Sequence, residues 1–321
     1  MYLHFLRYLV DPFTQESLSV EVEISEGDDV ISGFLVSSKN RFPIINGIPR
    51  FVPSEAYTSS FGWQWNHWSR VQFDSENCGK PMAGHTARMW HRITGLSASD
   101  TGEKAEVILD IGSGPGRFIE TVKNRNPNAL IIAVDYSNAV EATRRNFYLD
   151  SNVCVIQADA PIMSRCIDGA YSIGVLHHTP NPEAGVKEAF RVLKKSAWFA
   201  VSVYGKSGYY NFSSVQIWRK IFKFLWPYFG EKPPLIYTYF VVTIFRPVAR
   251  RLRILGWLIR VFFPFINLPD RKWSLLDTFD SITPAYQSAH ESFEVYGWFK
   301  LAGFANIEPT NWGYTSFRGT I

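Results

Sequence analysis

The chain has 321 residues, a length that accommodates one large α/β domain and a smaller appendage. Hydrophobic residues make up 46% of it and charged residues 19%, which excludes a disordered chain. The formal net charge of +4 is too small to indicate a nucleic-acid-binding protein.

Neither secretion nor a structural metal is indicated by the sequence. The N-terminal MYLHFLRYLVDPF lacks a basic start followed by a long apolar core, so no secretory signal is expected. No apolar run approaches the roughly 20 residues of a spanning helix. The three cysteines, Cys78, Cys154 and Cys166, lack the CxxC spacing of a zinc site. We expect a cytoplasmic protein without a disulfide framework or a cysteine-based metal site.

Residues 1–55 are expected to form a small β-rich module. Alternation of apolar and polar residues predicts strands over 18–24 and 31–36. The prolines and the Asn-Gly pair of FPIINGIPRFV predict a short strand, a tight turn and an extended exit. An aromatic linker follows over 56–104, and it includes a helix near 84–95.

Strand–helix alternation over 105–205 predicts a doubly wound α/β core. Strands are expected over 107–111, 130–135, 153–159, 170–176 and 197–204. Helices are expected over 117–125, 139–149 and 182–195. Regular βαβ alternation implies a parallel sheet with helices on both faces. Residues 283–321 are expected to complete the core with a helix over 292–304 and the last two strands.

Residues 206–282 interrupt this alternation with a basic, aromatic and proline-broken segment. Between 206 and 260, ten Lys and Arg residues stand against the single acidic residue Glu231, a net charge of +9. Lys and Arg mixed with Trp, Phe and Leu are typical of a helix that lies in a membrane interface. The alternative is a helical cap whose arginines are simply solvated. Both interpretations, peripheral membrane contact through 206–280 and a solvated cap, remain open.

The stretch VILDIGSGPGRF, residues 107–118, places three glycines directly after a predicted buried strand. Its G-x-G-x-G spacing differs from the G-x-G-x-x-G of dinucleotide folds, and the missing G-K-[ST] excludes a Walker loop. A carboxylate at Asp110 would repel a pyrophosphate and attract an ammonium group. The turn therefore predicts a ligand that is zwitterionic or cationic at one end.

Two more aspartates end the next two predicted strands. Asp135 stands where a carboxylate can take the hydroxyls of a ribose, and Asp159 where it can accept from the exocyclic amine of a base. Alternatively, each aspartate merely caps the helix that follows it. Three strand-terminal aspartates in register favour a nucleoside ligand.

These motifs, ILDIGSGPGRF, VDYS, QADA and SIGVLHHTPNP, resemble in order those of the class I S-adenosylmethionine-dependent methyltransferases. The resemblance covers about 105–205, and more loosely 283–318. It implies a seven-stranded, mostly parallel Rossmann-like sheet, with S-adenosylmethionine as cofactor. The cofactor contacts that it implies are Asp110, Gly112, Ser113, Gly114 and Gly116 at the methionine part, Asp135 and Tyr136 around the ribose, Asp159 and Ala160 at the adenine, and Ser172 and Gly174 near the sulfonium.

The flanking segments carry two further resemblances. DPFT and RFPIINGIPRFV are similar to Trm112-like zinc-ribbon modules, but the cysteine positions of those modules are vacant here, so no metal is expected. FGWQW, LDTFDSITPAY and WFKLAGF resemble methyltransferases of polysaccharide and lipopolysaccharide gene clusters.

Candidate catalytic residues follow the fourth strand of the core. His177 and His178 stand at the carboxyl edge of the sheet, where a histidine can take a proton from an acceptor hydroxyl. Arg117, Tyr286 and His290 are candidates for acceptor contacts, and Trp63, Gln64 and Trp65 for a lid over the cofactor.

The expected activity is methyl transfer to a hydroxyl of a glycan or of a lipid-linked glycan precursor. The alternatives are a phenol or quinone acceptor, a nicotinamide oxidoreductase, and a non-catalytic cofactor-binding or membrane-associated module.

Overall fold

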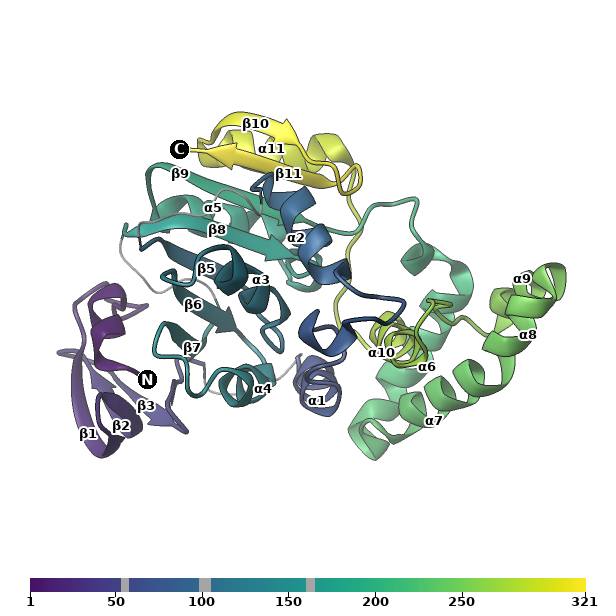
Figure 1. Ribbon diagram of the computed structural model, residues 1–321, viewed down its shortest axis with the longest axis horizontal. Helices are drawn as coiled ribbons and strands as arrows, with labels where there is room; N and C mark the ends of the chain where they lie inside the picture. The colour runs from purple at the N-terminus through teal and green to yellow at the C-terminus, as the bar shows by residue number, and fades with distance from the viewer. Residues whose placement is uncertain (53–57, 98–104, 160–164) are drawn as a thin grey trace.

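The computed structural model describes residues 1–52, 58–97, 105–159 and 165–321. A small N-terminal sheet lies at one end of the molecule, a large central sheet with flanking helices in the middle, and a helical arm at the other end (Figure 1). The two sheets hold β1–β4 and β5–β11.

The central sheet has seven strands in the order β10-β11-β9-β8-β5-β6-β7. The first five along the chain, which run parallel to one another, are β5 (Val107–Ile111), β6 (Leu130–Asp135), β7 (Val153–Gln157), β8 (Ile167–Ile173) and β9 (Leu193–Ser202). β11 (Ser316–Thr320) pairs antiparallel with β9, and β10 (Ala305–Pro309) pairs antiparallel with β11. The predicted doubly wound, mostly parallel seven-stranded fold is confirmed.

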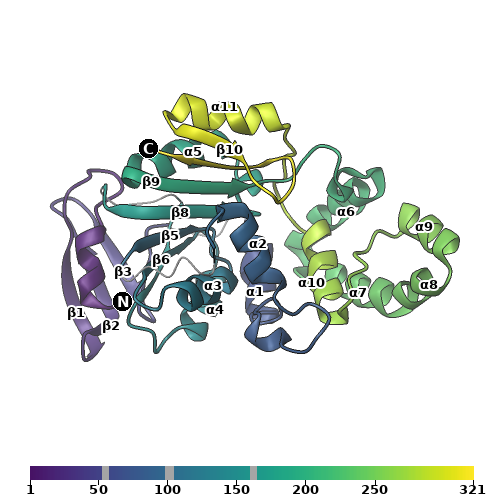
Figure 2. The same ribbon diagram turned by 45° about the horizontal axis from the view of Figure 1, so that its top comes forward.

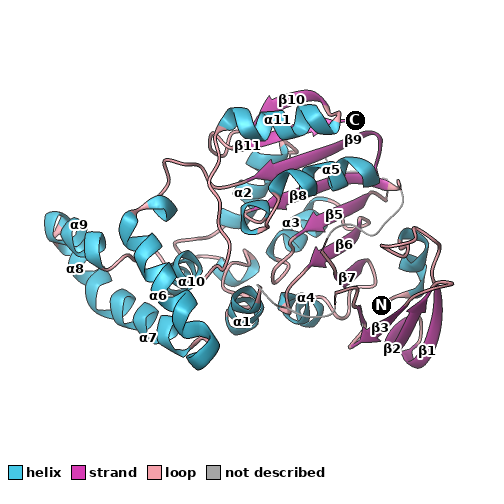
Figure 3. Cartoon of the chain, turned by 180° about the vertical axis from the view of Figure 1, so that it is seen from behind, coloured by secondary structure: helices cyan, strands magenta, loops and turns pink. Residues whose placement is uncertain are grey.

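Helices cover both faces of this sheet, as the βαβ pattern requires. α2 (His85–Thr94), α3 (Arg117–Arg125) and α4 (Ala139–Asn146) share one apolar core with it. On the opposite face, α5 (Pro182–Val192) and α11 (Ser292–Ala302) pack together with the N-terminal module (Figures 2 and 3). The alternate residues of β5 point to the two cores, and all five are buried because the strand is central.

Several predicted elements have different ends in the structure, and two of these differences have a clear local cause. The fourth core strand was expected to reach residue 176, but it ends at Ile173 because Gly174, with a φ of 75°, turns the chain. The short 3₁₀ turn η3 (Leu176–His178) follows. The helix expected over 182–195 ends at Val192, and the next three residues already belong to β9.

The N-terminal module contains the 3₁₀ turn η1 (Leu3–Tyr8) and four antiparallel strands: β1 (Ser19–Glu26), β2 (Asp29–Val36), β3 (Arg41–Ile45) and β4 (Ile48–Pro49). Its two loops, at 11–14 and 37–40, meet at the buried carboxylate of Asp11. Asp11 accepts hydrogen bonds from Ser37 Oγ at 2.5 Å, Asn40 Nδ2 at 2.8 Å and two backbone amides. A hydrogen-bonded carboxylate thus ties the loops together at the position where the resemblance would put a metal ligand. Within the described ranges, no three His, Cys, Asp or Glu side chains gather into a set that could hold a metal ion.

The segment between β9 and α11 is helical, as predicted. It contains the 3₁₀ turn η4 (Tyr209–Asn211), α6 (Ser213–Phe229), α7 (Lys232–Phe240), the π-helical turn η5 (Val241–Phe245), α8 (Arg246–Arg251), α9 (Arg253–Phe262) and α10 (Arg271–Ile282). We call residues 213–262, which run from α6 to α9, the arm. α10 packs beside α1 (Ser59–His67), and the arm extends away from the sheet (Figures 1 and 3). Of the helices described, none is long and apolar enough to cross a membrane.

Candidate active site

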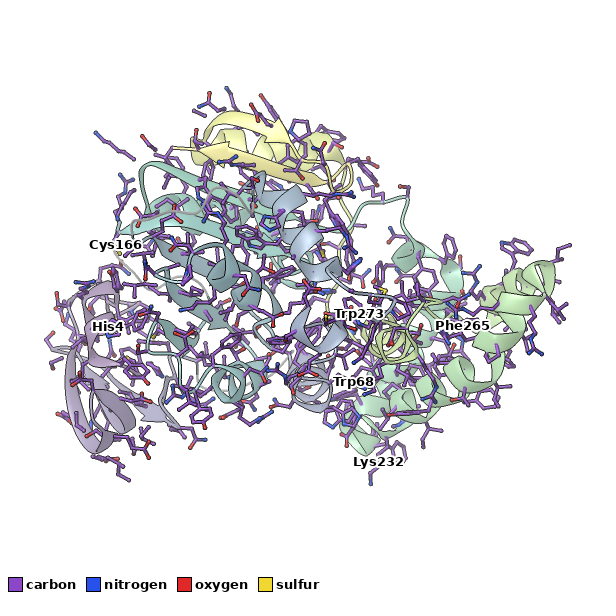
Figure 4. All side chains as sticks on the ribbon, in the orientation of Figure 1. His4, Trp68, Cys166, Lys232, Phe265 and Trp273 are labelled. Carbon is purple, nitrogen blue, oxygen red and sulfur yellow. The ribbon has the colours of Figure 1, made fainter. Side chains whose placement is uncertain are left out.

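A cavity of about 600 Å³ lies at the carboxyl ends of β5, β6 and β8. The sheet side of this pocket comes from the glycine turn and from the ends of the three strands. The opposite side comes from α1, η4 and α10, so the helical segment completes the site. Trp273 of α10, labelled in Figure 4, lies between the sheet and the arm and belongs to the pocket wall. Parallel α/β sheets bind their ligands at this edge.

The glycine turn shapes the floor of the pocket. A Cβ on Gly112 would stand 2.3 Å from the Val175 side chain, so only glycine fits there. Gly114 has a φ of 54°, and a Cβ on it would stand 3.4 Å from Nε1 of Trp65. A Cβ on Gly174 would meet no atom within 4 Å, and this residue lines the cavity. The hydroxyl of Ser113 also lines it, is buried, and has no hydrogen-bond partner in the part of the chain that is described. A close-fitting backbone and an unpaired buried hydroxyl fit a polar ligand such as the methionine part of S-adenosylmethionine.

Asp135 closes β6 beside this floor. Its Oδ1 accepts from the amide and the hydroxyl of Ser137, at 2.8 and 2.7 Å, and its Oδ2 accepts from the amide of Gly114 at 2.8 Å. Burial raises the pKa of Asp135, while these three hydrogen bonds favour the carboxylate. A carboxylate offers about four lone-pair sites, so one on Oδ2 is left for a ribose hydroxyl. Asp135 thus anchors the glycine turn and can accept one hydrogen bond from a ligand.

Tyr136 and Asp159, two other predicted cofactor contacts, also line the pocket. Asp159 is exposed at the end of the third core strand, where it can reach a base. Ala160, predicted next to it, lies outside the described residues.

Asp110 does not line the pocket, contrary to the prediction. It is buried within β5 and accepts a hydrogen bond from the hydroxyl of Tyr171 at 2.9 Å. The two residues are partners in the parallel register of β5 and β8, so their side chains lie on the same face. Burial raises the pKa of Asp110 to about 7. Through this hydrogen bond Asp110 links two central strands.

Gly116 and Ser172 were also predicted as cofactor contacts, and both lie outside the cavity. Gly116 precedes α3 with a φ of 86°, and a Cβ there would stand 2.8 Å from the Phe147 ring. It is a glycine because the first turn of α3 packs closely against its neighbours. The hydroxyl of Ser172 donates to the carbonyl of Ile111 at 3.1 Å, across the neighbouring strand.

The two adjacent histidines of η3 have different surroundings. His177 is fully buried outside the pocket, stacks on Tyr204 at 3.7 Å, and has no partner for either ring nitrogen among the residues described. Burial lowers its pKa well below the usual value, so it is a neutral core residue. The prediction that His177 is catalytic is therefore wrong.

His178 lines the pocket. Its Nδ1 lies 2.9 Å from the carbonyl oxygen of Tyr286, which can only accept. The proton must therefore reside on Nδ1, and Nε2 carries a lone pair with no partner in the described ranges. Burial lowers the pKa of His178, so the ring is neutral near pH 7. A neutral imidazole with a free Nε2 can take a proton.

Arg117 lines the pocket as predicted, and it is part of a hydrogen-bonded chain. Its guanidinium donates to Oε1 of Gln72, and Nε2 of Gln72 donates to Oδ1 of Asp277 at 3.2 Å. Burial and, to a smaller extent, the charge of Asp280 raise the pKa of Asp277 to about 7, while the guanidinium of Arg117 opposes this shift. The amide of Gln72 therefore separates a buried cation from a carboxyl that titrates near neutrality.

Asp280 stands one helical turn after Asp277 on α10, so both carboxyl groups face the cavity. Asp280 accepts from Nε2 of Gln64 at 2.9 Å and from the hydroxyl of Tyr204 at 3.5 Å. The Tyr204 ring stacks almost parallel on Tyr210, with centroids 4.1 Å apart. This part of the pocket, which we call the acceptor side, thus combines two carboxyl groups with stacked aromatic rings.

Two predicted acceptor contacts do not reach the cavity. Tyr286 is half-exposed, with Lys223 over its ring, and contributes only the carbonyl that holds His178. The ring of His290 lies 2.7 Å from the hydroxyl of Ser288, outside the pocket.

The predicted lid residues are divided between the pocket and the neighbouring core. Trp65 covers Gly114, and Gln64 holds Asp280. Trp63 instead stacks on His67 at 4.6 Å, away from the cavity.

Residues that the sequence reasoning missed make up most of the acceptor side. They are Phe61, Gln72, Tyr204, Tyr210, Asp277 and Asp280. The one local signal was the D-x-x-D spacing in LDTFD, which puts two carboxyl groups on one helix face. Gln72 and Phe61 carry no comparable signal.

Comparisons with known proteins agree with this geometry. Residues 109–201, under a third of the chain, match the sequence model of the methyltransferase-domain family Methyltransf_11. The chain is 29% identical over 186 residues to "Sterol methyltransferase-like 1" of Botryococcus braunii, which covers 55% of this chain and 44% of the relative. It is 32% identical over 117 residues to "Sterol methyltransferase-like 3" of the same organism, which covers 34% and 29%. The chain therefore spans less than half the length of these curated relatives.

Among solved structures, the chain is similar to a SAM-dependent methyltransferase from Aquifex aeolicus. The identity is 14%, the TM-score is 0.38, and the match covers 69% of this chain and 84% of that one.

The sheet order, the glycine turn and the family match support a core of the class I methyltransferase type. S-adenosylmethionine is the cofactor that this match implies. Of the predicted cofactor contacts, the described residues that line the cavity are Gly112, Ser113, Gly114, Asp135, Tyr136, Asp159 and Gly174.

Proposed function

We propose that the protein transfers a methyl group from S-adenosylmethionine to a hydroxyl group of a glycan or of a lipid-linked glycan precursor. The proposal is carried by the tautomer and the position of the His178 ring. A backbone carbonyl fixes its proton on Nδ1, and the lone pair of Nε2 is free in the same cavity as the glycine turn. A hydroxyl is a poor nucleophile until its proton is removed, and this residue is placed to remove it.

When bound, S-adenosylmethionine supplies an electrophilic methyl group on a sulfonium that leaves as a thioether. The residues of the chain position the acceptor oxygen and receive its proton at Nε2 of His178. The imidazolium that forms is stabilised by the hydrogen bond from Nδ1 to Tyr286 and by the nearby carboxylate of Asp280. Trp65 and Phe61 line the cavity and keep water from the reacting atoms.

The acceptor side of the pocket favours a polyhydroxylated ring. Carboxylates such as Asp277 and Asp280 accept hydrogen bonds from neighbouring hydroxyls, and the aromatic rings offer faces to the C–H groups of a sugar. The names of the curated relatives refer to sterols. A sterol has few polar groups and would cover the remaining acceptor sites of these carboxyl groups without offering them hydrogen bonds, which is costly. A glycan satisfies them.

A second candidate acceptor is a phenol or quinone. The parallel stack of Tyr204 on Tyr210 at 4.1 Å favours it, because a third flat ring can extend such a stack. The single hydroxyl of a phenol would give its proton to His178, and no group of the phenol would hydrogen-bond to the two carboxyl groups of α10.

The experiment has two stages. Calorimetry first compares S-adenosylmethionine with NADH; binding of NADH alone would overturn the proposal. Release of S-adenosylhomocysteine is then measured with glycans, lipid-linked oligosaccharides and phenols as acceptors. Turnover with a glycan acceptor, lost in Asp280→Asn but not in Glu308→Gln on exposed β10, is the expected result. Turnover with phenols alone would replace the glycan by the second candidate, and cofactor binding without any product would indicate a non-catalytic module.

A further inference from the structure

The arm exposes far more apolar surface than the rest of the molecule. In the described part of the chain, 16 of the 30 exposed large apolar side chains belong to the arm. Contiguous exposed apolar surface of this kind marks a site that contacts another apolar phase.

The exposed residues follow helical spacing. On α6 they are Ile217, Ile221, Phe224 and Tyr228, which are three or four residues apart and so lie on one face. On α7 and η5, Ile236, Phe240 and Ile244 repeat every four residues. Each helix therefore buries one face in the arm and presents a second apolar face to solvent.

α9 is the most exposed of these helices. Ile254 is 80% exposed and Trp257 is 60% exposed, and Leu258 and Val261 continue the same face. Gly256 holds the helix close to Ala249 of α8, because a Cβ there would stand 2.5 Å from the Ala249 Cβ. The helix is thus held through its glycine, and its large apolar side chains point away from that contact.

The charges around these faces are of one sign. Lys220, Lys223, Lys232, Arg250 and Arg251 are all exposed, and Lys232 points away from the protein at the turn between α6 and α7 (Figure 4). Residues 206–260 carry a net charge of +9, with Glu231 as the only acidic residue. A symmetric dimer through the arm would bring two such segments together, and like charges oppose that contact. An anionic lipid surface can bury the apolar faces among its acyl chains and attract the positive charges to its headgroups.

We infer that the arm docks on an anionic membrane surface, with the apolar face of α9 inserted at the level of the lipid headgroups. Arg250 and Arg251 stand at the end of α8, next to α9, where their charge attracts lipid phosphates. The Arg250 guanidinium also donates to Oδ1 of Asn267 and to the carbonyl of Leu268, each at 3.2 Å. This inference rests on the arm alone and does not depend on the proposed methyl transfer.

The test is co-sedimentation of the full chain with vesicles of phosphatidylcholine, with and without about a third of phosphatidylglycerol. We expect binding to the anionic vesicles that weakens at high salt. Ile254→Ser/Trp257→Ser/Leu258→Ser should weaken it on the order of 100-fold, because three apolar side chains no longer insert. Arg250→Gln/Arg251→Gln should weaken it roughly 10- to 30-fold, at about 1 kcal/mol for each charge.

Matched controls test whether the effect belongs to the arm. Phe293→Ser/Leu301→Ser removes two exposed apolar side chains from α11, and Lys195→Gln/Lys300→Gln removes two exposed charges outside the arm. Neither should change sedimentation, and all variants should bind S-adenosylmethionine like the wild type. Wild-type protein that stays in the supernatant with both kinds of vesicle would overturn the inference. So would a dimer in light scattering that the α9 variant converts to a monomer.

Discussion

The carboxylate of Asp11 should hold the N-terminal module together, and its contribution should depend on pH. Four hydrogen bonds to this side chain outweigh the effect of burial and lower its pKa from 3.8 to about 2. A depressed carboxyl pKa stabilises the folded state above the unfolded value, and this stabilisation is lost as the pH falls through the folded value. The shift corresponds to about 2 kcal/mol near pH 7, or a factor of roughly 30 to 60 in the equilibrium for local opening.

The perturbation is Asp11→Asn, which keeps the size of the side chain and removes its charge. The module holds none of the eleven tryptophans, so tryptophan fluorescence would not report its opening. Amide hydrogen exchange on peptides that cover the loops at 11–14 and 37–40 measures it directly. We expect protection to fall by the factor above at pH 7 and by roughly 10-fold at pH 3, which lies between the folded and unfolded pKa values, so that only part of the stabilisation is lost there.

Glu26→Gln is the control, because Glu26 is an exposed carboxylate on β1 of the same sheet. It should leave protection unchanged at both pH values. Equal protection in Asp11→Asn and wild type at pH 7 would refute the reasoning. A loss as large at pH 3 as at pH 7 would show that packing, and not the charge, is responsible.

Three further predictions concern the site and the metal. The wild type should bind S-adenosylmethionine in the micromolar range, about −8 kcal/mol. Asp135→Ala should weaken the affinity measured by calorimetry about 10- to 100-fold, because a charged hydrogen bond to the ligand and the hydrogen bond that anchors Gly114 are lost. An unchanged Kd would contradict this role of Asp135. His178→Gln should lower kcat about 100-fold or more in the methyl-transfer assay and leave cofactor affinity within a few-fold, whereas full turnover would remove it as the base. Elemental analysis should find no stoichiometric zinc, and a chelator should not change the melting temperature; one zinc per chain would refute the vacant-site argument.

The fold could be predicted because its signals are local. The βαβ periodicity fixes the parallel strands, and β5, β6 and α3 begin and end where the sequence predicts. The ends of β8 and α5 were misjudged because a glycine with positive φ and an early strand start interrupt otherwise continuous apolar patterns.

The site could be predicted only in part, since side-chain direction depends on tertiary contacts. His177 and His178 are neighbours in the sequence, yet one ring enters the core and the other the pocket. Asp110 has the position that the motif demands, but its register with Tyr171 keeps it out of the cavity. Asp277 and Asp280 lie far beyond the last of the core motifs in the sequence, on a helix that only the fold brings to the sheet edge.

The helical segment after β9 carries opposite charges on its two sides. Inside, α10 presents two carboxyl groups to the pocket, and outside, the arm presents lysines and arginines next to apolar faces. If the protein both docks on a membrane and methylates a lipid-linked glycan, these charges place the two ends of the acceptor, its lipid phosphate and its hydroxylated ring, at different sites. A lipid phosphate is repelled by the carboxyl groups of the pocket and attracted by the arm, whereas a neutral hydroxylated ring is accepted where Asp277, Asp280 and His178 meet. The same segment would thus hold a lipid-linked acceptor at the membrane with its hydroxyl end directed to the site of methyl transfer.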